Sequence, residues 1–133
     1  MIRLSDDEWK QVKETLSQPY GIVQLQADEY KVTVVCQPTS NILKCELVIY
    51  IDGKLKIAWA MEDCDIRRRF FSKHTRSTLK AADKRTLKKI PKKERERIEN
   101  KSKYEIYYPS WNSFNRMKSH FIKNNADIKL LRI

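Results

Sequence analysis

Basic side chains gathered in one stretch are the residues of this chain best suited to binding chemistry. Residues 66–103 contain 16 Lys or Arg and 4 Asp or Glu, whereas residues 1–65 contain 7 and 11. Nucleic acid presents a dense row of phosphates, and each Lys or Arg that contacts one releases a condensed counterion. The net charge of +11 is therefore concentrated in one segment. This concentration predicts a polyanionic ligand and favours nucleic acid, DNA or RNA.

The candidate contacts lie in the first two thirds of this basic segment. Three consecutive arginines supply planar groups suited to phosphate. A helix expected over residues 77–90 would carry a basic residue every four positions, in a stripe about 18 Å long. The predicted nucleic-acid contacts are Arg67, Arg68, Arg69, Lys73, Arg76, Lys80, Lys84, Lys88 and Lys89. Because phosphate contacts position a protein without reading bases, no sequence preference is expected.

Three ring side chains interleave with these charges. Phe70, Phe71 and His74 could stack on unpaired bases. Large apolar residues are usually buried, however, so we expect the two phenylalanines to lie in the core. The following stretch, 91–102, has one strong apolar residue, and a helix there would be polar nearly all round.

The same charges allow a second class of function, a protein-interaction module. The basic helix would then dock on an acidic partner protein, as an inhibitor does, and binding would again depend on salt. A chain that needed charge only for solubility would mix the two signs more evenly, as residues 92–103 do. A small, basic, glycine-poor chain of this kind is also typical of accessory proteins of bacteriophages and other mobile elements.

A magnesium-dependent nuclease is the lesser alternative. Such enzymes gather carboxylates near a lysine. The candidates are the cluster Glu62, Asp63 and Asp65, the pair Glu29 and Lys31, and the partners Asp28 and Asp52. The Glu-x-Lys spacing is common by chance and fits an ordinary outward-facing pair on a strand. We therefore expect no enzyme, assign no catalytic residue and predict no cofactor.

Cysteine and histidine side chains do not form a recognisable metal site. The potential ligands are Cys36, Cys45, Cys64, His74 and His120, whose spacings match no common zinc finger. Buried cysteines behave as small hydrophobes, which is the reading we favour. The odd number of cysteines, with no CxxC pair, indicates free thiols and a cytoplasmic location. No apolar run approaches the roughly 20 residues that span a bilayer, so no membrane partner is expected.

These residues must be positioned by a single α+β domain, residues 1–133. Residues 5–17 have a helix signature, with the capping-box spacing of Ser5 and Glu8 and an apolar stripe that includes Trp9. Four stretches then alternate as strands do: 22–27, 29–36, 42–51 and 54–61. Residues 1–65 are therefore expected to form a helix packed on a four-stranded antiparallel meander.

The hairpin between the third and fourth of these strands turns at Asp52-Gly53. A three-residue loop would pair Ile49 with Leu55 and place the apolar residues of both strands on one face. We therefore expect this register rather than the two-residue loop that pairs Ile51 with Lys54.

The remainder divides into the basic helical segment, 66–103, and a C-terminal part, 104–133. In the C-terminal part, the sequence predicts a short strand at 104–108, a helix at about 111–124 and an edge strand near 128–131. The helix has a wide apolar stripe of Trp111, Phe114, Met117, Phe121 and Ile122. A homodimer could form through this stripe or through an uncovered strand edge.

Overall fold

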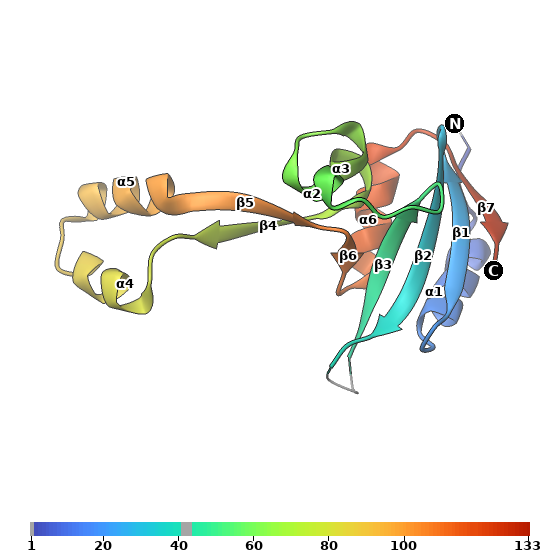
Figure 1. Ribbon diagram of the computed structural model, residues 1–133, viewed down its shortest axis with the longest axis horizontal. Helices are drawn as coiled ribbons and strands as arrows, with labels where there is room; N and C mark the ends of the chain where they lie inside the picture. The colour runs from blue at the N-terminus through green and yellow to red at the C-terminus, as the bar shows by residue number, and fades with distance from the viewer. Residues whose placement is uncertain (1, 41–43) are drawn as a thin grey trace. The chain divides into compact units, whose positions relative to one another are not determined.

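The computed structural model describes residues 2–40 and 44–133. Within these residues it contains an antiparallel sheet of five strands in the order β6-β3-β2-β1-β7 (Figure 1). The strands are β1 (Ile22–Ala27), β2 (Tyr30–Pro38), β3 (Cys45–Ile51), β6 (Ser110–Trp111) and β7 (Ile128–Arg132). The predicted α+β class is confirmed, but the sheet has five strands rather than four. The expected third strand began at 42, and positions 41–43 lie outside the described residues.

Helices cover one face of this sheet and close the core (Figure 1). They are α1 (Asp6–Leu16), α3 (Asp65–Phe70) and α6 (Phe114–Asn124). The ring of Trp9 on α1 meets that of Phe114 on α6 at a centroid distance of 6.3 Å. Phe70 and Phe121 meet edge to face at 5.5 Å. The core position predicted for Phe70 and Phe71 is confirmed, since both side chains are fully buried.

The N-terminal helix forms as its local sequence predicts. The Ser5 hydroxyl accepts the N–H of Glu8 at 3.2 Å, and the Glu8 carboxylate accepts the N–H of Ser5 at 3.0 Å. Three acidic residues in the first turn suit the positive end of the helix dipole. The buried stripe contains Trp9, Val12 and Leu16, and it packs against the sheet.

The predicted fourth strand, 54–61, is wrong. A two-residue turn at Asp52-Gly53 ends in an isolated bridge between Ile51 and Lys54, and the short helix α2 (Ile57–Met61) follows. The pairing of Ile49 with Leu55 is therefore also wrong. Asp52 and Gly53 have φ of 52° and 77°, as a two-residue hairpin turn requires.

The free edge of β3 is occupied by β6 instead. Leu47 pairs with Trp111, and the Trp111 indole N–H donates to the Phe70 carbonyl at 2.8 Å. Trp111 therefore belongs to a strand, and α6 begins three residues later than the helix predicted at about 111–124. The edge strand predicted near Ile128–Leu131 is confirmed as β7, which pairs with β1.

The chain contacts divide the molecule into two compact units. The core unit comprises residues 1–72 and 107–133 and holds the five-stranded sheet. The basic unit comprises residues 73–106. Its helices are α4 (Ala81–Leu87) and α5 (Lys92–Ser102), which lie in sequence between strands β4 (Ser72–Ser77) and β5 (Lys103–Tyr108).

The basic unit differs from the helical segment expected over 66–103. Strands β4 and β5 pair as a two-stranded sheet and run in opposite directions (Figure 1). The helix expected over 77–90 is shortened to 81–87, because residues up to Ser77 belong to β4. The short strand expected at 104–108 is present as β5. No helix in the described part of the chain is long and apolar enough to cross a membrane.

Candidate nucleic-acid interface

One of the predicted contacts, Arg69, is paired within the core unit. Its guanidinium lies 2.6 Å from the Asp28 carboxylate and 2.9 Å from that of Asp65. Asp28 also accepts the N–H groups of Asp127 and Ala126 at 2.8 and 3.1 Å. These backbone hydrogen bonds, together with Arg69, lower the pKa of Asp28. The charge of Arg69 is therefore balanced by acidic groups of the same unit.

The two preceding arginines also have partners within the core unit. Arg68 lies 3.2 Å from the Asp63 carboxylate, and Arg67 lies 3.8 Å from it. The Arg67 guanidinium also stacks over the ring of Tyr107, 3.9 Å from its centroid. Asp63–Arg67 and Asp65–Arg69 are each four residues apart, and the second pair lies on α3, so this pairing had a signal in the sequence.

The remaining predicted contacts lie in the basic unit. Lys73 on β4 pairs with Glu105 on β5 at 2.9 Å, with both side chains half exposed. Five further residues are exposed, and none forms an ion pair with any residue that the structure describes. These five are Arg76, Lys80, Lys84, Lys88 and Lys89.

The local structure places three of these lysines along one short helix. The Asp83 carboxylate accepts the N–H of Lys80 at 3.1 Å and so starts α4, while Leu87 is the buried residue of this helix. Lys80, Lys84 and Lys88 then recur from the N-cap to the C-cap over about 12 Å. Arg76 lies on β4, so the expected 18 Å stripe on a single helix is shortened.

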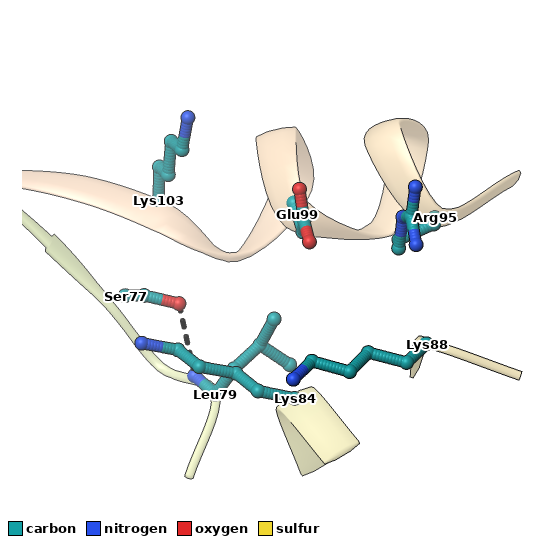
Figure 2. A pocket seen from close by; sticks show the side chains of 7 residues that line it. All are labelled: Ser77, Leu79, Lys84, Lys88, Arg95, Glu99 and Lys103. Atoms are coloured by element: carbon teal, nitrogen blue, oxygen red, sulfur yellow. Dashed lines mark hydrogen bonds between the residues drawn. The ribbon is translucent and has the colours of Figure 1, made fainter. Parts of the chain in front are cut away.

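A groove with a volume of about 450 Å³ lies between α4 and α5 (Figure 2). Lys84 of α4 and Lys88, its C-cap, line one side of it, opposite Arg95 and Glu99 of α5 (Figure 2). Its lining residues are Ser77, Leu79, Lys84, Lys88, Arg95, Glu99 and Lys103. The Ser77 hydroxyl accepts the N–H of Leu79 at 3.1 Å, which fixes the chain at the start of α4.

Sequence reasoning had missed two basic residues of this groove, Arg95 and Lys103. Both lie within residues 66–103, the segment expected to contact phosphates, but on its stretch of mixed charge, and neither was among the nine named contacts. Arg95 and Glu99 are four residues apart and therefore share one side of α5, whereas Lys103 is the first residue of β5 and had no such signal.

Four of the carboxylates considered for a nuclease, those of Asp28, Asp52, Asp63 and Asp65, have structural partners. Asp28 binds Arg69 and two backbone N–H groups, and Asp52 accepts the N–H of Lys31 at 3.1 Å. Among the residues that the structure describes, no group of three or more His, Cys, Asp or Glu could hold a metal ion.

The cysteine and histidine side chains likewise have local surroundings that account for them. All three cysteines are free thiols. Burial, followed by a hydrogen bond with Cys45, raises the pKa of Cys36 to about 11. Cys64 Sγ lies 3.5 Å from the Trp59 carbonyl. His120 Nε2 lies 2.8 Å from the Arg68 carbonyl, and burial lowers the pKa of this histidine.

The candidate interface is thus defined by charge and geometry within the basic unit. Its cations lie on β4, on and beside α4, on α5 and at the start of β5, and four of them, Lys84, Lys88, Arg95 and Lys103, line one groove. No protein-family model matches the chain, and no curated protein or solved structure shows significant similarity to it.

Proposed function

We propose that the protein binds nucleic acid, DNA or RNA, by phosphate contacts from the basic unit. The observation that supports this is the unequal balance of charge between the two units. Residues 73–106 contain 13 Lys or Arg against 5 Asp or Glu. The core unit balances its three consecutive arginines with its own carboxylates, whereas most cations of the basic unit have no such partner among the described residues.

The composition of the basic unit favours nucleic acid over an acidic protein. The buried centres of protein interfaces are enriched in aromatic residues and depleted in lysine. Residues 73–106 contain nine lysines and one Phe, Trp or Tyr residue, Tyr104. Lysine is a compact, mobile point charge that suits contact with phosphates along a backbone. A surface of this kind supplies affinity through counterion release and needs no apolar centre.

Binding of this kind would depend strongly on salt and weakly on base sequence. If six cations engage duplex DNA, the logarithm of the affinity should fall with the logarithm of the salt concentration with a slope of about −5. Arg76, Lys80, Lys84, Lys88 and Lys89 are the cations that we assign first. The paired arginines of α3 are not needed for this slope, because α4 and α5 supply further exposed cations.

Two matched variants test the proposal. The first replaces five cations of the basic unit by alanine: Arg76, Lys80, Lys84, Lys88 and Lys89. The second replaces five exposed cations of the core unit: Lys10, Lys13, Arg116, Lys123 and Lys129. Both lose the same charge. Binding of fluorescent DNA and RNA, single- and double-stranded, is followed by anisotropy as a function of salt.

We expect the basic-unit variant to lose most of its affinity and most of its salt slope, and the core-unit variant to retain both. Equal losses in the two variants would show that only net charge matters and would overturn the assignment. No binding of any nucleic acid by the unmodified protein at low salt would refute the function itself. Recovery of a protein partner after nuclease treatment would then favour the acidic-partner alternative.

A further inference from the structure

We propose that the groove between α4 and α5 receives one strand of nucleic acid, so that the basic unit prefers single-stranded to double-stranded ligands. The inference rests on the proposed function and adds to it the class of ligand and the place where it binds. All the residues that line the groove belong to the basic unit.

The charge of the groove is the first reason. Four cations line it, Lys84, Lys88, Arg95 and Lys103, against one carboxylate, Glu99. None of these five side chains forms an ion pair with a described residue. Like charges gathered around one groove repel one another, whereas an anion among them is attracted to each. A phosphate of the ligand is the anion that the proposed function supplies.

The way in which the cations are distributed strengthens this reason. Lys84 lies on α4 and Lys88 is its C-cap, whereas Arg95 lies on α5, so cations line the groove on both sides (Figure 2). A nucleic-acid strand that lies between the helices can therefore contact cations on both of its sides. A flat basic surface would offer contacts on one side only.

The size of the groove is the second reason. A volume of about 450 Å³ lies within the range of 300–1,000 Å³ that is usual for small-molecule sites. The major groove of a duplex is about 12 Å wide and itself admits an α-helix, so a whole duplex is too wide to enter a space between two helices. A duplex can touch only the rim, whereas the backbone of one strand can enter.

The lining also includes surface that is not charged. The side chain of Leu79 is half-buried and lies at the groove with Ser77 (Figure 2). An exposed base in a single strand offers an apolar face to such a side chain, whereas the bases of a duplex are stacked inside. The mixture of cations with one aliphatic side chain therefore suits an unpaired strand.

Two triple variants of equal charge separate the groove from the rest of the basic unit. The groove variant is Lys84→Ala, Lys88→Ala and Arg95→Ala. The control variant is Lys92→Ala, Lys93→Ala and Arg97→Ala, three exposed cations of α5 that do not line the groove. Each is titrated with a fluorescent 12-nucleotide single strand and with the matching duplex, at four salt concentrations. Circular dichroism confirms that both variants are folded.

We expect the unmodified protein to bind the single strand more tightly than the duplex at every salt concentration. With about 0.7 counterions released per single-strand contact, the groove variant should lose about 2 units of salt slope, and the control less than 1. Equal losses in the two variants, or tighter binding of the duplex, would overturn the groove assignment while leaving nucleic-acid binding intact. Failure of the unmodified protein to bind either ligand would instead refute the proposed function.

Discussion

The carboxylate of Asp28 ties three segments of the core unit together, and its replacement by asparagine is the sharpest test of this arrangement. Asp28 lies in the turn between β1 and β2 with φ of 49°, a conformation that Asp and Asn tolerate better than other residues. Its oxygens accept from Arg69 and from the N–H groups of Ala126 and Asp127. Asn keeps the backbone conformation and one acceptor oxygen, but loses the charge and the second acceptor.

The expected loss can be estimated from these contacts. The ion pair with Arg69 is partly exposed and contributes at most about 1 kcal/mol. One backbone N–H left without its acceptor costs about a further 1 kcal/mol or more. Asp28→Asn should therefore lower the free energy of unfolding by about 2 kcal/mol, or the Tm by about 8 °C for a chain of this size.

The pH dependence of this loss gives an independent check. Because the folded state lowers the pKa of Asp28, its stabilisation is complete above the unfolded value of about 3.9 and is lost as the pH falls through the folded pKa. The difference between the two proteins should therefore be largest near neutral pH and shrink below about pH 4. Urea unfolding followed by tryptophan fluorescence at several pH values measures it.

Asp52→Asn is the matched control for this experiment. Asp52 has a φ of 52° in another turn, where it accepts one backbone N–H, that of Lys31, and has no ion pair with a described residue. Its replacement should cost less than about 1 kcal/mol, because Asn can keep the single hydrogen bond. Equal losses for the two variants, with no pH dependence of the Asp28 effect, would refute the reasoning.

Three further predictions follow from single contacts. Arg69→Gln should lower stability by about 1 kcal/mol and leave the salt slope of nucleic-acid binding unchanged, whereas a slope smaller by about one unit would show that Arg69 contacts a phosphate. Trp111→Phe should cost about 2 kcal/mol in urea unfolding, because the buried Phe70 carbonyl loses its donor; an unchanged midpoint would contradict this. Cys36 should react with iodoacetamide at pH 8 far more slowly than Cys45, since burial covers its thiol and raises its pKa to about 11, and equal labelling by mass spectrometry would contradict this.

Elements with a complete local signal were predictable from the sequence. The helix α1 begins where the Ser5–Glu8 capping box places it, because both hydrogen bonds of that box join residues three apart. Strands β1 and β2 follow the alternation of apolar residues, since one face of the sheet is covered by helices. In these cases the decisive contacts lie within a few residues of one another.

The prediction of a fourth strand over 54–61 was wrong because no strand edge was left for it to pair with. Leu55, Ile57 and Met61 alternate as a strand would, yet they are 38%, 78% and 76% exposed. The edge that they would have joined is taken by Trp111, whose indole reaches a carbonyl 41 residues away in sequence. A pattern within a few neighbouring residues cannot predict a contact between residues so far apart in the sequence.

The candidate site was predicted in part. Charge alone identified the lysines around α4, which the structure leaves exposed and, among the described residues, without ion pairs. It also included Arg67–Arg69, two of which have their carboxylate partners four residues earlier in the sequence. Arg95 and Lys103 were missed because a groove between two helices depends on how the chain reverses at residues 88–91, which composition does not reveal.

The connection of the basic unit to the rest of the chain has a consequence for how the two parts can vary. The chain leaves the core unit after Ser72 and returns at Tyr107, and the Ser72 hydroxyl donates to the Ser110 carbonyl at 2.7 Å. The points at which the chain leaves and re-enters the core unit are therefore adjacent. For the core unit, the 34 intervening residues are equivalent to a loop whose two ends are held together. Doubling the length of such a loop costs only about 0.6 kcal/mol in closure entropy. Insertions, deletions or a complete exchange of the residues between these two points should therefore cost little in the folding of the five-stranded sheet.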